Sequence, residues 1–366
     1  MGKVFLDMRK KWHNPVLLFL FLLGTFSAAG IRAQSTQYPP PKQVAHDFRA
    51  LVQKTKTDFN ISTPVITTDA VFIEKRFITY RGKAEKIPLV IYKPLDAAEK
   101  RLPVVICLHG TGGSKDASDV KNILYRLTKA GFIGVAIDAR YHGERVGDGV
   151  NDSKAYVEAI TRAWKNTDTA HQEHPFFFDT VADIWTLIDY LTLRPDIDAT
   201  RIGMTGISMG GIETWMAASV DTRVKVIVPI IAVQCFQWSL GNDRWQGRAH
   251  TIWAAHRQAA ADLGDTAVNK QNVKAVWDKL LPGITGEFDC PSMLRLFAPR
   301  PLLILSNEKD ENCPLPGAQI AFAEAKQAYQ EKGAADKLEM VVSPNEPHRL
   351  LPGHVKRMIE FFSKWL

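Results

Sequence analysis

The segment Gly206–Gly210 reads Gly-Ile-Ser-Met-Gly and so carries the pattern Gly-x-Ser-x-Gly. This pattern is typical of a tight turn between a strand and a helix, which lifts a serine hydroxyl clear of the sheet edge. The flanking sequence agrees, because Arg201–Ile207 has the apolar character of a strand and Met209–Val220 that of a helix. We therefore predict that Ser208 is a nucleophile. The alternative is a serine that only caps a helix.

Two further residues suit the partners that a serine nucleophile needs. A hydroxyl attacks a carbonyl efficiently only when a base accepts its proton and an acid orients that base. Asp310 follows the apolar, strand-like segment Leu302–Ser306, and His348 follows the similar segment Leu338–Val342. The order serine, acid, histidine predicts a Ser208–Asp310–His348 triad. One alternative stays open for each partner: Glu308 as the acid and His354 as the base.

Ester or amide chemistry also requires two backbone N–H groups that stabilise an oxyanion. Met209 supplies one candidate, because it opens the helix after Ser208, where the helix dipole is favourable. Thr111 supplies the other, in the glycine-rich segment His109–Gly113 after the apolar strand Val104–Leu108. This segment lacks the Gly-Lys-Ser/Thr ending of a phosphate-binding loop. We therefore predict Thr111 and Met209 as the oxyanion hole.

The elements that must hold these residues alternate along the chain. Short apolar segments typical of buried strands are separated by segments with helical spacing of apolar residues. This alternation predicts an α/β fold with a mainly parallel sheet and helices on both faces. The predicted strands are Val71–Tyr80, Ile87–Lys93, Val104–Leu108, Ile133–Ile137, Arg201–Ile207, Val224–Ile231, Leu302–Ser306 and Leu338–Val342. The predicted helices are Asp119–Ala130, Phe178–Leu193, Met209–Val220, Leu315–Tyr329 and Val355–Leu366.

Two long segments, 141–177 and 234–299, interrupt this alternation. Both begin where a predicted strand ends, and open α/β sheets bind ligands at that edge. The second segment holds four of the nine tryptophans, which suits a cap over a ligand pocket. We predict a helical cap at about 234–299 with Trp238 and Trp245 in contact with substrate. Packing of the cap against the main domain explains the aromatic residues equally well.

The N-terminus has the features of an export signal. A basic start precedes the apolar run Val16–Ala29, and a cleavage site follows at about Ala33. Loss of residues 1–33 would lower the formal charge from +7 to +3, so we expect no nucleic-acid partner. We predict a secreted or periplasmic protein without a membrane span after cleavage; an uncleaved anchor is the alternative. Residues 34–64 would form a linker and lead-in, and residues 65–366 one catalytic domain.

Export also affects the interpretation of the cysteines, because oxidising compartments permit disulfides. Cys107 lies in an apolar strand and is predicted as a buried thiol. A disulfide between two of the other three cysteines, Cys235, Cys290 and Cys313, remains an alternative. His171 and His174 lie three residues apart but match no common zinc signature. We expect neither a metal nor another cofactor, and predict no oligomeric state.

Together these segments resemble the α/β-hydrolase superfamily over residues 65–366, and within it the acetyl-esterase and dienelactone-hydrolase-like branch. The segments that carry the resemblance are His109–Gly110, Asp138–Gly143, Gly206–Gly211 and Asp310–Pro314. It implies an α/β-hydrolase fold with an eight-stranded sheet.

The resemblance also implies a serine carboxylesterase that acts on small-molecule or carbohydrate esters, including acetyl esters. Ser208 stands where dienelactone hydrolases have cysteine, and Thr111 where carbohydrate acetyl esterases often have an aromatic residue. An amidase or peptidase with the same triad, and a non-catalytic ligand-binding protein, are the alternatives.

Overall fold

The computed structural model describes residues 38–52, 59–80, 86–96, 101–146, 152–175 and 177–366. The predicted export signal, residues 1–33, lies outside these ranges. Within them, no helix combines the length and the apolar character needed to cross a membrane. The described residues belong to one compact unit that spans 38–366.

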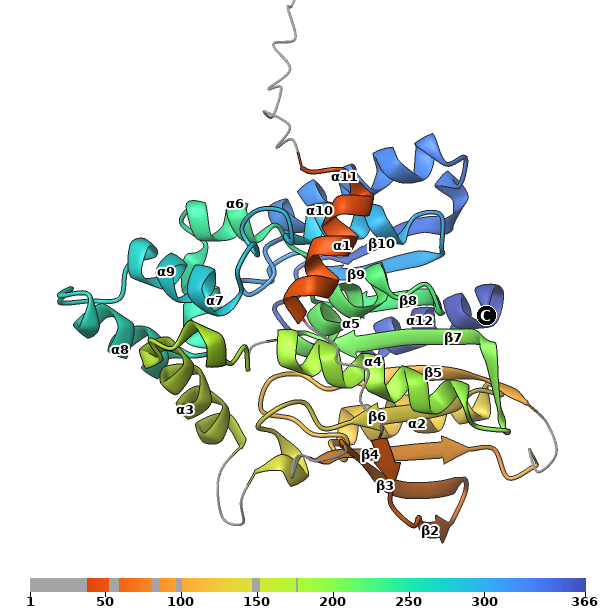
Figure 1. The fold of residues 1–366 in the computed structure, drawn as a ribbon. Coiled ribbons are helices and arrows are strands. Elements are labelled where there is room, and N and C mark those ends of the chain that lie inside the picture. Colours follow the sequence, from red (N-terminus) through yellow and green to blue (C-terminus); the bar gives the residue numbers. More distant parts are fainter. Residues whose placement is uncertain (1–37, 53–58, 81–85, 97–100, 147–151, 176) are drawn as a thin grey trace, which may run out of the picture. The chain divides into compact units, whose positions relative to one another are not determined.

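A ten-stranded sheet forms the core of this unit (Figure 1). The strands follow the order β1-β3-β4-β6-β5-β7-β8-β9-β10, and β2 pairs with β3. Their bounds are β1 Phe59–Ile61, β2 Val65–Thr68, β3 Phe72–Tyr80, β4 Lys86–Lys93, β5 Leu102–Leu108, β6 Ile133–Ile137, β7 Ile197–Ile207, β8 Val224–Ile230, β9 Leu302–Asn307 and β10 Leu338–Ser343.

The sheet confirms the predicted mainly parallel α/β-hydrolase fold. Strands β6, β5, β7, β8, β9 and β10 pair in parallel, whereas β1 to β4 form antiparallel pairs at one side. The count of eight strands is wrong, because β1 and β2 add to β3. Strand β1 has only three residues, too few to mark a strand by alternation, and all four residues of β2 are exposed, so β2 shows no alternating burial.

Helices cover both faces of the sheet. Val104, Ile106 and Leu108 of β5 belong to one buried cluster, and Val105 and Cys107 to the other, because successive strand residues point to opposite faces. Helices α2 and α12 pack into the second cluster, and the remaining helices with buried apolar residues pack into the first.

The helix bounds agree closely with the sequence, except that α12 begins three residues before the predicted Val355, at a proline suited to a first turn. The α-helices are α1 Pro41–Val52, α2 Ser118–Lys129, α3 Asp152–Lys165, α4 Phe178–Thr192, α5 Met209–Val220, α6 Phe236–Gly241, α7 Trp245–His250, α8 Trp253–Asp262, α9 Lys270–Leu280, α10 Cys290–Phe297, α11 Leu315–Glu331 and α12 Pro352–Trp365. The 3₁₀ helices are η1 Gly143–Arg145, η2 Thr169–His171 and η3 Ala335–Lys337.

Helices α6 to α10 form the insertion between β8 and β9. Figure 1 shows α6 to α9 at the end of the sheet where β7 leads into α5, together with α3 from the first insertion. Helix α3 packs against α8 and α9. The two segments that interrupt the alternation in the sequence therefore meet over one edge of the sheet.

Helix α1 lies in the segment that the sequence analysis treats as a linker and lead-in. Its Val44 and Phe48 are fully buried, and the Phe48 ring stands edge-on to the rings of Phe178 and Phe288 at 5.4 and 5.2 Å. Edge-to-face aromatic pairs of this kind stabilise a core. The helix packs against α4, α5 and α10.

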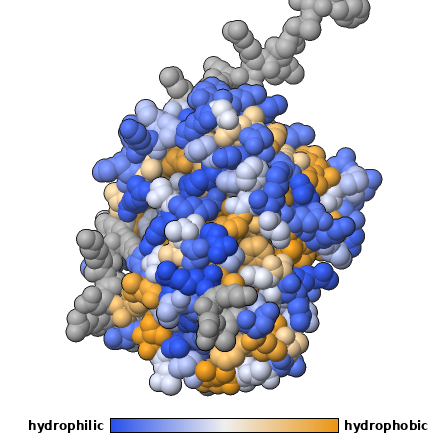
Figure 2. Space-filling view, turned by 90° about the vertical axis from the view of Figure 1, so that its right-hand side faces the viewer, coloured by the Kyte–Doolittle hydropathy of each residue, from blue (hydrophilic) through white to orange (hydrophobic). Residues whose placement is uncertain are grey.

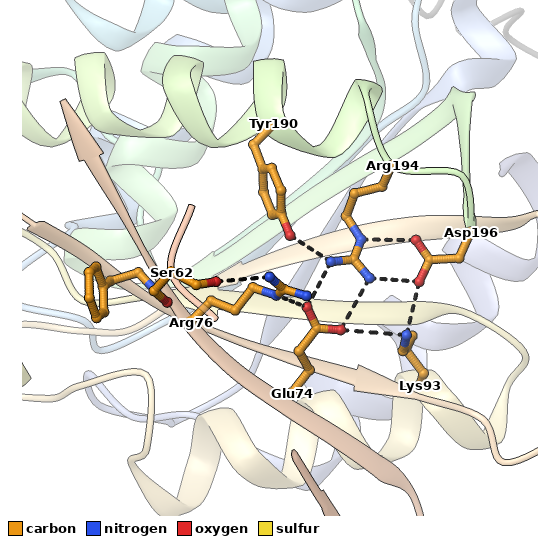
Figure 3. Close-up of polar contacts among 8 residues, drawn as sticks. Ser62, Glu74, Arg76, Lys93, Tyr190, Arg194 and Asp196 are labelled. Atoms are coloured by element: carbon orange, nitrogen blue, oxygen red, sulfur yellow. Dashed lines mark hydrogen bonds and ion pairs between the residues drawn. The ribbon is translucent and has the colours of Figure 1, made fainter. Parts of the chain in front are cut away.

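A buried ion-pair network joins the antiparallel strands to the connection between α4 and β7 (Figure 3). Arg194 donates to both carboxylate oxygens of Glu74 at 2.8 and 3.2 Å, and to those of Asp196 at 2.9 and 2.7 Å. Lys93 donates to Asp196 at 3.0 Å. Burial raises the pKa of Asp196, but the hydrogen bonds and charges of Arg194 and Lys93 outweigh it and hold that pKa at about 2.

Apolar side chains on the face seen in Figure 2 gather in separate groups among hydrophilic ones. Isolated exposed apolar side chains are normal on soluble domains. We assign no binding role to this face.

Candidate active site

Ser208 lies on a strained turn between β7 and α5. Its backbone has φ 53° and ψ −110°, in a region that costs free energy for a residue with a Cβ atom. The Ser208 N–H donates to the carbonyl of Ile230 at 2.9 Å, which anchors the turn to β8. The predicted strand–turn–helix context of the serine is therefore present.

The glycines of the motif are required by close backbone contacts. A Cβ atom at Gly206 would lie 2.2 Å from the carbonyl oxygen of Gly210, and one at Gly210 would lie 2.4 Å from the carbonyl oxygen of Leu108. Both contacts involve backbone atoms, which cannot rotate away. Only glycine lets β7, β5 and α5 approach closely enough to form this turn.

The three residues of the predicted triad form one hydrogen-bonded chain. His348 Nε2 lies 2.8 Å from Ser208 Oγ, and His348 Nδ1 lies 2.7 Å from Asp310 Oδ2. Asp310 is 4% exposed, and its Oδ1 accepts from the N–H groups of Asn312 and Cys313 at 2.8 and 2.7 Å. Hydrogen bonds to both oxygens hold the carboxylate in place and leave it as an acceptor for the imidazole.

The two alternative partners have other contacts. Glu308 accepts from the N–H of Asn345 at 2.7 Å. His354 Nε2 lies 3.0 Å from the hydroxyl of Ser343, and burial lowers the pKa of His354. Among the residues described, neither side chain is hydrogen-bonded to Ser208.

Asn307, which sequence reasoning missed, holds the loop that carries His348. Its buried side-chain amide donates to the carbonyl of Pro347 at 2.6 Å and to that of Arg349 at 2.9 Å. These carbonyls stand on either side of His348. The only signal in the sequence is an asparagine at the end of an apolar strand, three residues before Asp310.

The loop after β5 lies beside Ser208. A Cβ atom built at Gly110 would lie 3.8 Å from the Cβ of Ser208, so the next residue, Thr111, is close to the nucleophile. The Met209 N–H is the first of α5 and belongs to the groups that a helix cannot pair internally. In the described ranges, neither the Thr111 nor the Met209 N–H donates to another backbone group.

His109 fixes the carbonyl of Gly110. Its Nε2 accepts from the N–H of Ala139 at 3.0 Å, so its Nδ1 carries the proton and donates to the Gly110 carbonyl at 2.8 Å. Burial lowers the pKa of His109 to about 4. The imidazole is therefore neutral at ordinary pH, as its acceptor role requires.

His142 fixes the other side of Thr111. Its Nε2 accepts from the N–H of Gly112 at 3.1 Å, and its Nδ1 therefore donates to the carbonyl of Arg140 at 2.8 Å. The two histidine rings lie 5.0 Å apart. The peptide groups before and after Thr111 are thus each bonded to a buried imidazole, a feature that the sequence analysis did not predict.

The tryptophans of the cap occupy different environments. Trp238 of α6 and Trp245 of α7, the predicted substrate contacts, are both half-buried. Trp277 is buried against Phe236, with ring centres 5.4 Å apart, whereas Trp253 is 39% exposed. Enrichment in tryptophan alone does not distinguish these cases.

All four cysteines are free and buried, so the bridge left open by the sequence is not formed. Among the described residues, one group has ligand atoms close enough for a metal ion: Asp310, Cys313 and His348. The 2.7 Å hydrogen bond between Asp310 and His348 accounts for that proximity. His171 and His174 instead bond to Asp168 and to the carbonyl of Leu280, both at 2.7 Å.

Comparisons with known proteins identify the family of the chain. The model of the family "Acetyl xylan esterase (AXE1)" matches residues 34–237, more than half of the chain. "Putative hydrolase YtaP" of Bacillus subtilis (strain 168) is 25% identical over 300 residues, which cover 77% of this chain and 84% of that protein.

Two solved structures share the fold. Acetyl xylan esterase 1 from Thermoanaerobacterium sp. JW/SL YS485 is 18% identical with a TM-score of 0.63, and the match covers 90% of this chain and 95% of that one. The acetyl xylan esterase from Paenibacillus sp. R4 is 18% identical with a TM-score of 0.60, over 88% and 94% of the two chains.

Proposed function

We propose that this chain, which belongs to the acetyl xylan esterase family and is a carboxylesterase, hydrolyses its esters through a Ser208–His348–Asp310 triad and an acyl-enzyme. One observation carries the proposal: hydrogen bonds of 2.7 and 2.8 Å link Asp310 to His348 and His348 to Ser208. In this arrangement a base touches the nucleophile and an acid orients the base.

Acylation begins when Ser208 Oγ attacks the ester carbonyl and His348 Nε2 takes its proton. Asp310 stabilises the imidazolium and holds its Nδ1–H. The carbonyl oxygen becomes an oxyanion, which accepts from the N–H groups of Thr111 and Met209. The imidazolium then gives its proton to the departing alcohol as the carbon–oxygen bond breaks. Water, deprotonated by His348, then attacks the acyl carbon. The bond between that carbon and Ser208 Oγ breaks, His348 returns the proton to Ser208 Oγ, and the acid leaves.

We propose short-chain acyl esters of carbohydrates, acetyl esters first, as the substrates. The family and both structural neighbours described above carry the name acetyl xylan esterase. Trp238 and Trp245 are half-buried residues of the cap helices, and aromatic faces of this kind suit contact with sugar rings. A screen over acetylated xylan, short-chain and long-chain esters tests this assignment.

We propose that the protein is exported and acts outside the cytoplasm, in the periplasm or beyond the cell. The basic start and the apolar run Val16–Ala29 support this. A mature N-terminus near residue 34 is expected. An unprocessed Met1 on exported protein would support an anchor instead.

The triad is tested with Ser208→Ala and His348→Ala, measured on p-nitrophenyl acetate. We expect kcat to fall by at least about 10⁴-fold in each, and a fluorophosphonate probe to label the wild type but not Ser208→Ala. His354→Gln is the matched control and should keep most activity. Wild-type turnover by folded Ser208→Ala would refute the assignment, and faster cleavage of a matched anilide than of the ester would favour an amidase.

A further inference from the structure

Arg248 of cap helix α7 is a buried cation without a counter-ion. The residue is 3% exposed, and its Nε and Nη2 atoms have no hydrogen-bond partner in the described part of the chain. No carboxylate of the described residues forms an ion pair with it. Its neighbour in the same cap, Arg244, is exposed.

A buried guanidinium without a counter-ion destabilises the folded protein. Arginine stays charged at every pH that a protein meets, so it cannot avoid the free-energy cost of a buried charge by losing a proton. Most buried charges in proteins are paired, because desolvation without a partner costs much free energy. An anion that binds beside Arg248 would remove this cost.

The turn of α7 that carries Arg248 touches the loop of the proposed triad acid. Figure 1 shows α7 among the cap helices at the end of the sheet where β7 leads into α5. A Cβ atom at Gly247 would lie 2.0 Å from the carbonyl oxygen of Glu311, so α7 touches the chain next to Asp310. Burial raises the pKa of the Cys313 thiol, and the nearby charge of Arg248 opposes that rise.

Arg248 also lies near Tyr156 of α3, whose ring packs beside the loop of the proposed oxyanion hole. Burial raises the pKa of Tyr156, the charge of Glu213 adds to this, and Arg248 again opposes it. The Tyr156 ring packs on the His142 ring at 4.7 Å, and His142 holds Gly112 beside Thr111. Arg248 therefore lies near residues that contact the two loops that the proposed mechanism brings together at the ester.

We propose that Arg248 is the anion subsite of this active site and binds a carboxylate carried by the ester substrate, as in an acylated uronic acid. The inference rests on the proposed function and specifies its substrate class. A carboxylate matches the planar fork of a guanidinium and forms charge-assisted hydrogen bonds with it. Because this pair forms away from water, a substrate without the negative charge would leave the Arg248 guanidinium unpaired. The site is therefore selective for the ionised substrate.

The test compares acetyl esters of glucuronic acid and of glucuronamide, which differ only in the carboxylate. Wild type is expected to show a kcat/KM roughly 10- to 100-fold higher for the acid, as a charged hydrogen bond warrants. Arg248→Met should reduce the ratio of the two to near one, and Arg248→Lys should keep part of it. Arg244→Met, the matched control in the same cap, should keep the wild-type ratio.

Two further measurements separate this proposal from a structural role and from the proposed triad. Arg248→Met should melt at the same temperature as the wild type or higher, because it removes an unpaired buried charge. In the Ser208→Ala background, calorimetry should detect glucuronate binding that Arg248→Met abolishes. That result would establish Arg248 as the carboxylate-binding residue even if Ser208→Ala kept its activity and the proposed triad were wrong. An unchanged acid-to-amide ratio, or equal glucuronate binding with and without Arg248, would overturn the proposal.

Discussion

The contact between Asn307 and the His348 loop leads to a sharp prediction for Asn307→Leu. Leucine has the branched skeleton of asparagine, with a larger volume, but donates no hydrogen bond, so the variant leaves the carbonyls of Pro347 and Arg349 without their donors at 2.6 and 2.9 Å. Two neutral hydrogen bonds are worth about 2 kcal/mol together. Because Pro347 and Arg349 are exposed, water can replace part of the loss, and we expect the free energy of unfolding to fall by less than about 2 kcal/mol.

The effect on catalysis should be larger than the effect on stability. His348 must reach Ser208 Oγ and Asp310 Oδ2 at the same time, and a displacement of about 1 Å can cost about 100-fold in rate. We expect kcat on p-nitrophenyl acetate to fall by about 10- to 100-fold, with KM changed by less than about twofold, since a small ester gains little binding energy from this loop. Labelling by a fluorophosphonate should slow in parallel.

Ser343→Ala is the control, because Ser343 contacts His354 rather than His348. It should keep the wild-type kcat. If Asn307→Leu also keeps that kcat while its unfolding midpoint falls, the loop is held by its backbone contacts alone, such as the bond from the Lys309 N–H to Glu346 at 2.9 Å. Asn307 would then have a structural role only.

Three further changes have defined outcomes. Gly210→Ala places a Cβ 2.4 Å from the Leu108 carbonyl; we expect esterase activity to be nearly lost and a urea-unfolding free energy lower by about 1–3 kcal/mol. Glu74→Ala removes a buried partner of Arg194 and should cost about 3 kcal/mol by the same measurement without changing kcat of the folded protein. Burial lowers the pKa of His256 from 6.5 to about 4. Between these pH values the unfolded chain binds a proton at His256 that the folded chain does not. The free energy of unfolding is therefore highest above pH 6.5 and falls by about 3 kcal/mol toward pH 4. His256→Leu should flatten that decline in urea titrations at pH 7 and 4.5, and an equal decline would contradict the assignment to His256.

The main elements could be predicted because their signals are local. Each central strand is apolar along its whole length, and each helix between them has its own periodic face. Ser208, Asp310 and His348 of the proposed triad could be named because each lies in the segment that follows such a strand, where a parallel sheet brings loops to one edge. Strand β2, with every residue exposed, has no such pattern and was missed.

The supporting residues of the site could not be predicted, because their roles depend on contacts between distant segments. Nothing near His109 in the sequence indicates that its ring accepts a hydrogen bond from the Ala139 N–H. Nothing near Asn307 indicates that its amide donates to the carbonyls on both sides of His348. The cap shows the same limit. Its helices α6 and α7 have six residues each, too few for a periodic face, so the burial of Arg248 depends on packing alone.

The contacts around Thr111 extend further, into the body of the domain. Arg140, whose carbonyl accepts from His142, forms two hydrogen bonds with the buried Asp183 of α4, at 2.7 and 3.0 Å. Burial opposes the ionisation of Asp183, but Arg145 and Arg140 outweigh it and hold the pKa of Asp183 at about 2. This link therefore requires an ionised carboxylate.

The loop consequently depends on two groups that must both be deprotonated. Asp183 must be ionised, which holds above about pH 2, and His109 must be neutral, which holds above about pH 4. As the pH falls, His109 is the first of the two to change, and its protonation removes the acceptor for the Ala139 N–H. Acid should therefore disturb the proposed oxyanion loop through His109 while the Arg140–Asp183 pair is still intact.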